Sequence, residues 1–391
     1  MATDNDPHAP VFARLGEVPS RFFPAPFIEA VGLVEDYGRA WAVELARRLE
    51  LEDQLAEGTS TSELVARLGL VPRFELALSW LLASLVDGGW AERRTDGAVQ
   101  LTAPLPSPAR KEIRQRTLAL DAAHAVTLDL LDAAGEAFVP VGRAERSGEE
   151  VLLGPGGMGL WARYFANDNA LYAINNRVAA VAAAGRLAGE GSFSILEVGA
   201  GGGSGTETLL RELAERGTLG RLERYLVTEP SPFFRRRSQR ALIAAWPVVP
   251  LSFGDLDIDR PWSDQGVAPE SVDLVFAVNV IHVAKDLGFS LGEARKALRP
   301  GGWLVAGECV RPFQGRAIAA ELVFGLLEGF TAVKLEPEVR PNPGFLTADE
   351  WRRALHHAGF PEVTMVPDVE AIAELVPNFL TAAVCARAPG A

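Results

Sequence analysis

The chain has little cysteine and no long hydrophobic run. Only two cysteines occur in 391 residues, Cys309 and Cys385, both in segments expected to form strands. So few cysteines exclude a disulfide framework and are typical of a reducing compartment. No apolar stretch reaches the length of a membrane-spanning helix, and the start, Met1 to Asp6, lacks the apolar core of a signal peptide. We therefore expect a cytoplasmic protein without a membrane partner.

Positive charge is also scarce. The chain has 38 Lys and Arg against 51 Asp and Glu, a net charge of −13, and a pI near 5.0. Such an excess of acidic groups disfavours binding to nucleic acids and to anionic membranes. The five histidines form no cluster with Cys or Asp at metal-ligand spacing. We therefore expect neither a nucleic-acid partner nor a bound metal.

The most informative stretch is the glycine-rich run from Ile195 to Gly205. An apolar strand pattern reaches the acidic Glu197, and a helical pattern follows from Thr206. Glycines let the backbone turn sharply and approach a ligand closely, because they have no Cβ. The glycines of this run are Gly199, Gly201, Gly202, Gly203 and Gly205. The pattern predicts a strand, loop and helix that bind a nucleotide in an open α/β sheet.

The motifs of phosphate-rich nucleotides are missing from this run. The dinucleotide pattern G-x-G-x-x-G fails, because Ser204 or Thr206 occupies its sixth position, and no G-x-x-x-x-G-K-[ST] loop exists. Glu197 would repel a phosphate but suits a cationic amino acid or a sulfonium. The run resembles the first motif of class I methyltransferases. That resemblance implies S-adenosyl-L-methionine (SAM) as cofactor, with Glu197, Gly199, Gly201 and Gly203 among its contacts.

Further strand ends follow in the order that an adenosine site needs. Tyr225 to Glu229 reads as a short strand whose final carboxylate could accept both ribose hydroxyls. In the next segment, from Leu251 to Asp259, either Asp255 or Asp257 could take the adenine amino group. These spacings strengthen the prediction of a SAM site.

Two more segments complete the expected sheet. Val272 to Asn279 is a buried strand pattern that leads to His282. Leu298 to Glu308 reads as a helix end, a Pro-Gly turn and another strand. In doubly wound sheets, binding and catalytic sites form where such strands end. This position favours a functional role for His282 over a purely structural one.

Residues 160–388 are similar to the C-methyltransferase domains of polyketide synthases. The resemblance implies a Rossmann-like, mostly parallel seven-stranded domain, a catalytic dyad of His282 and Glu308, and a cofactor contact from Asn279. It depends on the segments Thr228-Glu-Pro-Ser-Pro-Phe-Phe, Leu256-Asp-Ile-Asp, Asn279-Val-Ile-His and Phe324-Gly-Leu-Leu-Glu-Gly-Phe.

The residues before this region predict a mainly α-helical domain. Ser60-Thr-Ser-Glu63 is a capping box that opens a helix ending near Gly69, a second helix begins at Pro72, and a hairpin turns at Asp96-Gly97. Residues 25–105 resemble the winged-helix dimerisation domain of small-molecule O-methyltransferases. Residues 55–101 carry four Arg against six acids, too little positive charge for a phosphate-binding face.

We therefore predict four segments: an N-terminal arm (1–24), a winged-helix dimerisation domain (25–105), a helical linker (106–160) and a SAM-dependent methyltransferase domain (161–391). The apolar stripes of residues 25–105 exceed what so small a module buries alone, so we expect a homodimer through it. In similar enzymes the segment that follows residue 160 closes over the ligands, which makes Tyr164 and Asn175 candidate cofactor contacts, although its aromatics could also simply pack between the domains.

The expected function is methyl transfer to a small molecule. A neutral His282 suits removal of a proton from an enol, a phenol or an acidic C–H, and Glu308 would fix its tautomer. Methylation on oxygen or on carbon both fit, and the acceptor is not identified by the sequence. The alternatives are S-methylation by proximity alone and a non-catalytic SAM-binding protein, for which the glycines and Glu229 would be enough.

Overall fold

The computed structural model describes residues 8–390, which divide into two compact units. The first unit holds residues 8–24, 165–312 and 333–390, and the second holds residues 25–164 and 313–332. Residues 1–7 of the expected arm and residue 391 of the expected methyltransferase domain lie outside the described residues.

The first unit is built on a seven-stranded sheet with the order β5-β4-β3-β6-β7-β9-β8. The five strands from β5 to β7 are parallel, and β9 and β8 add to them in antiparallel fashion. Their bounds are β3 (Phe193–Val198), β4 (Leu222–Thr228), β5 (Leu251–Gly254), β6 (Val272–Val278), β7 (Leu298–Cys309), β8 (Glu362–Val366) and β9 (Thr381–Arg387). This is the mostly parallel α/β sheet that the sequence predicted.

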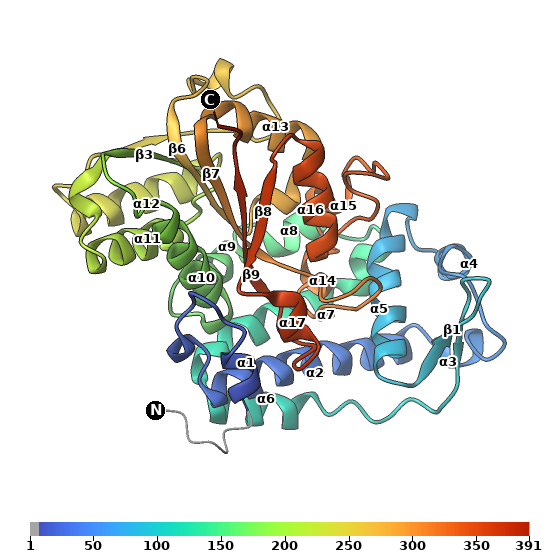
Figure 1. The fold of residues 1–391 in the computed structure, drawn as a ribbon. Coiled ribbons are helices and arrows are strands. Elements are labelled where there is room, and N and C mark those ends of the chain that lie inside the picture. The colour runs from blue at the N-terminus through green and yellow to red at the C-terminus, as the bar shows by residue number, and fades with distance from the viewer. Residues whose placement is uncertain (1–7, 391) are drawn as a thin grey trace. The chain divides into compact units, whose positions relative to one another are not determined.

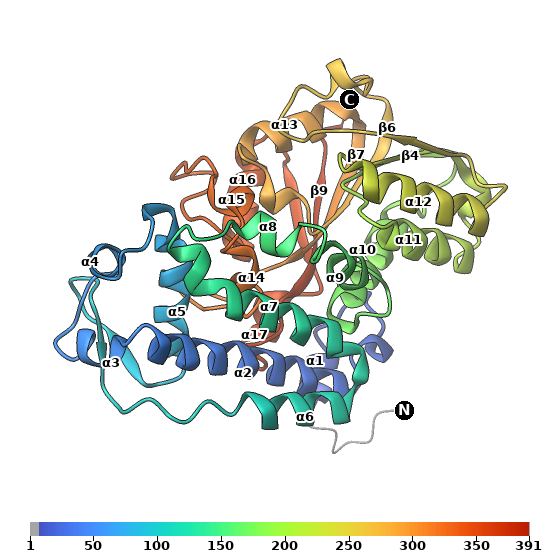
Figure 2. The same ribbon diagram turned by 180° about the vertical axis from the view of Figure 1, so that it is seen from behind.

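Helices cover both faces of this sheet (Figures 1 and 2). Side chains alternate between the two faces along a strand: in β7, Gly307 faces α10, where a Cβ would lie 2.7 Å from Ala179, so Glu308 faces the other side. The helices α10 and α11 pack together, while α13 packs with α16. The helices are α1 (Ala9–Phe12), α10 (Ala170–Arg186), α11 (Ser204–Glu215), α12 (Pro232–Ala245), α13 (Leu287–Ala297), α16 (Ala348–His357) and α17 (Val369–Ala373), with 3₁₀ turns at Ser20–Phe22, Leu219–Arg221, Ser263–Gln265 and Ile281–Val283.

The central strands are buried on both faces, as their sequences indicate. Every residue of β3 is buried, and β6 is a nearly continuous apolar run, which is typical of a parallel strand between two helical layers. One boundary differs from the prediction. Strand β7 already begins at Leu298, and the expected Pro-Gly turn is an irregularity in its pairing with β6.

The second unit is mainly helical. Helix α2 packs against α5, α6 and α7, and α14 packs against α5 and α7. The helices are α2 (Ala25–Arg48), α3 (Leu51–Gln54), α4 (Thr61–Arg67), α5 (Glu75–Asp87), α6 (Arg110–Leu120), α7 (Ala125–Gly142), α8 (Gly148–Leu152), α9 (Met158–Tyr164), α14 (Glu321–Phe324) and α15 (Glu328–Thr331), with 3₁₀ turns at Pro72–Phe74 and Ala122–His124. Ser60 and Glu63 form the expected capping box, and β1 (Ala91–Arg93) pairs with β2 (Val99–Leu101) as the expected hairpin.

The two units divide the chain differently from the four predicted segments. Residues 8–24 belong to the sheet unit, where Phe23 packs on Phe379 with their rings 5.0 Å apart and Glu17 pairs with Arg186. Residues 313–332 join the helical unit, because Trp80 Nε1 donates to the Ile318 carbonyl and Glu35 accepts from the Ala319 amide. These long-range contacts have no sequence motif.

The apolar stripes of residues 25–105 are covered within the same chain. Helices α6, α7 and α14 pack on α2 and α5, and no large hydrophobic side chain in residues 25–105 is exposed. The argument for a homodimer from an uncovered patch is therefore wrong, and the dimer itself stays a prediction. In residues 8–390 no helix combines the length and hydropathy that a membrane span requires.

Candidate active site

The expected site residues of the first unit gather at one edge of the sheet. Strands β3, β4, β5, β6 and β7 run parallel, so their carboxyl ends meet at the same edge. In open α/β sheets ligands bind in the crevice outside these ends. The predicted residues from Glu197 to Glu308 all lie within or just after these strands.

The glycine loop between β3 and α11 depends on backbone conformations that favour glycine. Gly199, Gly201 and Gly203 have φ values of +65°, +53° and +86°. A Cβ on Gly199 would lie 2.6 Å from the Val280 side chain, whereas a Cβ on Gly201 would meet nothing within 4 Å. The loop therefore packs tightly on its β6 side and leaves open space beside Gly201, where a ligand could approach the backbone.

Glu229 follows β4 and is tied directly to this loop. Its Oε2 accepts from the Gly201 amide at 2.9 Å and its Oε1 from the Ser231 amide at 2.8 Å. Burial raises the pKa of this carboxyl, and the two amides and Arg235 oppose that effect. A carboxylate has about four acceptor positions, so capacity for two ribose hydroxyls remains.

Glu197 lies beneath the loop and bonds to neighbouring hydroxyl groups. Its Oε2 accepts from Thr206 Oγ1 at 2.6 Å and from the Tyr225 hydroxyl at 2.8 Å, and the residue is 2% exposed. Burial raises its pKa to about 7. The structure therefore gives Glu197 a role in holding β3, β4 and α11 together, and its contact with the cofactor stays a prediction.

The start of α10 supplies two buried acceptor atoms that have no hydrogen-bond partner. They are Oδ1 of Asn175 and Oδ1 of Asn176. Asn176 Oδ1 lies 3.5 Å from the Cβ position of Gly205, at the start of α11. Buried polar atoms without partners are rare in proteins, so both are candidates to accept a hydrogen bond from a ligand.

A short segment before α10 closes over the start of α11. The Phe165 carbonyl accepts from Ser204 Oγ at 2.6 Å, and Asn167 donates to the Ser204 carbonyl at 3.1 Å. Asn176 in turn donates to Asn167 Oδ1 and to Ser204 Oγ. This network fixes the segment from Phe165 to Asn167 beside the glycine loop.

Asp255 and Asp257 follow β5 and are both exposed. Asp255 lies 3.9 Å from Arg235, whose Nη1 also donates to the Glu229 carbonyl. The backbone of Asp257 is held by Gln265, which accepts from its amide and donates to its carbonyl. The adenine contact of either carboxylate stays a prediction.

His282 and Glu308 form a direct pair in a buried setting. His282 Nδ1 lies 2.5 Å from Glu308 Oε2, and the residues are 2% and 0% exposed. Glu308 Oε1 accepts from the Ile281 amide at 3.1 Å, and the Phe345 ring packs on the imidazole with centroids 4.8 Å apart. The pair thus joins the turn after β6 to the end of β7, with the imidazole in a fixed orientation.

Asn279 marks the turn between β6 and His282. It has a φ of +54°, a left-handed conformation that asparagine tolerates better than most residues. Its amide donates to the Gly307 carbonyl and its Oδ1 accepts from the Cys309 amide. These bonds turn the chain so that His282 faces Glu308, while the expected cofactor contact of Asn279 stays a prediction.

Two further expectations concern other places in the chain. Tyr164 ends α9 in the second unit, where its ring lies 5.5 Å from that of Trp161, so its ligand contact stays a prediction. Among residues 8–390 no group of three or more His, Cys, Asp and Glu is arranged to hold a metal ion.

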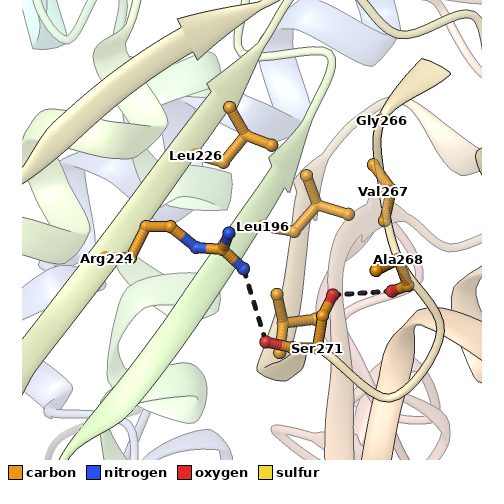
Figure 3. Close-up of a pocket in the computed structure, with 8 residues that line it drawn as sticks. Leu196, Arg224, Leu226, Gly266, Val267, Ala268 and Ser271 are labelled. Atoms are coloured by element: carbon orange, nitrogen blue, oxygen red, sulfur yellow. Dashed lines mark hydrogen bonds between the residues drawn. The ribbon is translucent and has the colours of Figure 1, made fainter.

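A small pocket of about 50 Å³ lies away from the predicted residues (Figure 3). It lies beside Leu196, Leu226 and the segment from Gly266 to Ala268, and Arg224 donates across it to the Ser271 carbonyl at 3.4 Å. None of the expected site residues lines it, so it has no place in the site.

The observed groups fit a SAM molecule. The open space beside Gly201, the remaining acceptor capacity of Glu229 and the unpartnered Asn175 and Asn176 oxygens match a ligand with ribose hydroxyls and an ammonium group. The sequence did not identify Asn176, Phe345 or the buried Arg340. Asn176 had one signal, an amide within an alanine-rich helix, whereas Phe345 and Arg340 lie in a loop without a motif.

The comparisons with known proteins agree with this fold. Residues 196–304 match the family model described as a methyltransferase domain. The chain is 31% identical over 302 residues to the polyketide synthase ThaG of Burkholderia thailandensis, which is 76% of this chain and 5% of that protein. The chain therefore spans only a small part of this relative's length.

Solved structures share the fold. The CurJ carbon methyltransferase superposes with a TM-score of 0.78 at 24% identity and covers 98% of both chains. The trans-methyltransferase CalH, in complex with SAH (S-adenosylhomocysteine), superposes with a TM-score of 0.63 at 20% identity and covers 94% of this chain and 92% of that one. Residues 196–304 therefore form a methyltransferase domain, and the chain shares the fold of these solved methyltransferases.

Proposed function

We propose that the enzyme methylates the α-carbon of an enolisable small molecule of the β-ketoacyl thioester class, with His282 as general base. The observation that carries this proposal is the buried pair of His282 Nδ1 and Glu308 Oε2, 2.5 Å apart. SAM would supply an activated methyl group on its sulfonium, held by the glycine loop and Glu229. The chain itself must then generate the nucleophile.

His282 can do this in one tautomer. With Nδ1–H donating to Glu308, the neutral ring carries its lone pair on Nε2. That nitrogen would accept the α-proton of the acceptor, which leaves an enolate whose α-carbon would bond to the methyl group. The S–CH₃ bond would break, and S-adenosylhomocysteine would leave. A general base in such a position contributes about 10²–10⁴-fold to the rate.

Glu308 would orient the ring and stabilise the imidazolium. The carboxylate is completely buried, and its second oxygen is held by the Ile281 amide, so it cannot turn away from the ring without leaving that amide unsatisfied. Charge interactions are stronger in such a setting than in water. The pair therefore works as the base-and-orienter arrangement known from catalytic triads.

Carbon is favoured over oxygen by the relatives. The matched polyketide synthase and the CurJ carbon methyltransferase support an acceptor with an acidic C–H. O-methylation of a phenol or enol would use the same base and is the second candidate. S-methylation and simple SAM binding need no base, so they give no reason for a buried carboxylate, which is costly to desolvate without a function.

The test is a transfer assay with methyl-labelled SAM. The acceptors are β-ketoacyl thioesters, phenols, thioethers and 2-oxo acids, and the position of the label in the product is read by NMR. We expect label on the α-carbon of the thioester. Label on a phenol oxygen would change the proposed reaction to O-methylation. Label on a thioether sulfur would show that the reaction needs no general base.

Other predictions from the sequence remain proposals. Helix α4, helix α5 and the β1–β2 hairpin support a winged-helix assignment, and Arg73 is the only basic residue between Pro72 and Asp87, which supports a role other than nucleic-acid binding. We retain the homodimer through residues 25–105 as a proposal to be tested by light scattering, and the cytoplasm as the expected compartment.

A further inference from the structure

Arg340 is a completely buried arginine in the loop before α16. It is 1% exposed. Its Nη1 donates to the Ala284 carbonyl at 3.2 Å and its Nη2 to the Gly344 carbonyl at 3.1 Å, while its Nε has no hydrogen-bond partner. A buried guanidinium is costly to desolvate, so its position calls for an explanation.

The two carbonyls belong to the two segments that enclose His282. Ala284 ends the 3₁₀ turn Ile281–Val283 that carries the imidazole. Gly344 directly precedes Phe345, whose ring lies 4.8 Å from that of His282. One planar guanidinium therefore joins the segment that carries the base to the segment that packs on it.

The loop around Arg340 is itself fixed. Its backbone pairs with Glu336 in both directions, at 2.8 and 2.9 Å, and the Lys334 amide donates to the Lys285 carbonyl at 2.7 Å. The segment after the base is thus held twice, by a backbone bond at Lys285 and by the guanidinium at Ala284. The guanidinium also connects it to the Phe345 side through the Gly344 carbonyl.

The charge of Arg340 also acts on the base's partner. Burial lowers the pKa of Arg340 to about 10, and the nearby carboxylates of Glu308 and Glu350 oppose this effect. Arg340 therefore stays protonated near pH 7. Its positive charge therefore acts close to Glu308, the partner of the base.

We propose that Arg340 is a positioning residue for the His282–Glu308 pair. It clamps the His282 turn and the Phe345 segment around the imidazole and supplies a buried positive charge to Glu308. This inference rests on the proposed function of the pair. It predicts a loss of turnover with little loss of cofactor binding, because the hydrogen bonds of the guanidinium go to the Ala284 and Gly344 carbonyls and not to the glycine loop or Glu229.

The first test replaces Arg340 with Met, which keeps most of the side-chain length without the charge or the donors. The control is Arg186→Met, a half-buried arginine that pairs with Glu17 and packs over Trp303. Two lost charged hydrogen bonds predict a fall in kcat of about tenfold or more for Arg340→Met. We expect the acceptor KM and the SAH affinity to change by less than about threefold. Arg186→Met should keep near-normal turnover.

The second test asks whether the planar fork is required. Lys keeps the charge but is a point donor that cannot reproduce the fork geometry, so Arg340→Lys should recover little activity. In Arg340→Ala, free guanidinium at about 20 mM should restore part of kcat, because the ion can occupy the vacated site and donate to both carbonyls. The same ion should not restore His282→Ala.

Each outcome decides a different point. A wild-type kcat in Arg340→Met overturns the inference. Full activity in Arg340→Lys overturns the requirement for the planar guanidinium fork. If Arg340→Met fails to fold, which would be seen as loss of SAH binding, the Arg340→Lys variant and guanidinium rescue of Arg340→Ala decide instead. An active Arg340→Lys variant together with no rescue of Arg340→Ala would count against the inference. If His282→Ala keeps its turnover, the proposed function fails, whatever Arg340 does.

Discussion

The proposed cofactor side and the proposed acceptor side of the sheet edge are built differently. On the cofactor side, the amide of the positive-φ Gly201 after β3 and the amide of Ser231 after β4 hold Glu229. On the acceptor side, after β6 and β7, the imidazole of His282 is fixed by Glu308, Phe345 and the Arg340 fork, which come from distant parts of the chain. The first side is a local backbone device, whereas the second is an assembly of side chains.

The difference indicates that the two sides have separate roles, one in binding and one in catalysis. A backbone loop can bind the same cofactor in many enzymes, because it depends on conformation and little on side-chain identity. A buried base needs a charged partner and fixed geometry, so it requires specific long-range contacts. Changes on the acceptor side should therefore affect turnover alone, and changes on the cofactor side should affect binding.

The largest effect should come from His282→Ala. We expect methyl transfer to fall by about 10²–10⁴-fold, while SAH affinity stays nearly intact, because the ring is held by Glu308 and Phe345 and would act on the acceptor's proton. Turnover measured with labelled SAM and affinity measured by calorimetry give both values. A parallel loss of SAH binding would mean that the two sides are not separate.

Glu308→Gln should give a smaller loss of turnover on the same side. The amide keeps the shape but loses the charge that stabilises the imidazolium, and a hydrogen bond to a charged group corresponds to about 10–100-fold. The measurement is kcat at saturating acceptor. An unchanged kcat would reduce Glu308 to a structural partner of the Ile281 amide.

Gly201→Val should affect the cofactor side alone. Valine strains a φ of +53° and fills the open space beside Glu229, so we expect SAH affinity to fall by about tenfold or more, or about 1.4 kcal/mol. Gly217→Val is the matched control, because Gly217 also has a positive φ and open space around it but lies after α11. Equal losses in both variants would point to general strain.

The smallest effect concerns stability and pH. Burial raises the pKa of Glu197 from 4.5 to about 7, so the folded state holds this proton more tightly than the unfolded state does. The resulting stabilisation is complete below about pH 4.5 and is lost as the pH rises to about 7. Glu197→Gln, which resembles the protonated acid, should be more stable than wild type by about 1 kcal/mol at pH 8.

Urea unfolding at pH 5 and pH 8 checks this expectation, with Glu215→Gln at an exposed position of α11 as the control. The gain of Glu197→Gln should be larger at pH 8 than at pH 5. A variant that is less stable than wild type at pH 8 would show that the ionised carboxylate is needed by Thr206 and Tyr225.

The sequence predicted the strands and the glycine loop well and the surroundings of His282 only in part. The strands, the glycine loop and the position of Glu229 follow from residues close together in the chain, where hydrophobic periodicity and glycine spacing are informative. His282 and Glu308 were identified through the resemblance. Arg340 and Phe345 were missed, because only the return of the chain from β7 to α16 brings their loop to the imidazole.

Two other differences have the same cause. The second unit includes residues 313–332 because Trp80 and Glu35 bond to the backbone at Ile318 and Ala319, and these contacts span more than half of the chain. The expected homodimer patch was misjudged because α6, α7 and α14 cover the stripes of residues 25–105. Local patterns show that a face is apolar but do not show what covers it.

The most direct test of the central claim is hydrogen exchange at the acceptor's α-carbon. An α-deuterated β-ketoacyl thioester is incubated with SAH and either wild-type enzyme or His282→Ala in ordinary water, and the loss of deuterium above the buffer rate is followed by NMR. If His282 removes the α-proton, wild-type enzyme accelerates the exchange without any methyl transfer, and His282→Ala does not. Equal exchange rates in the two proteins would contradict the assignment of His282 as the base.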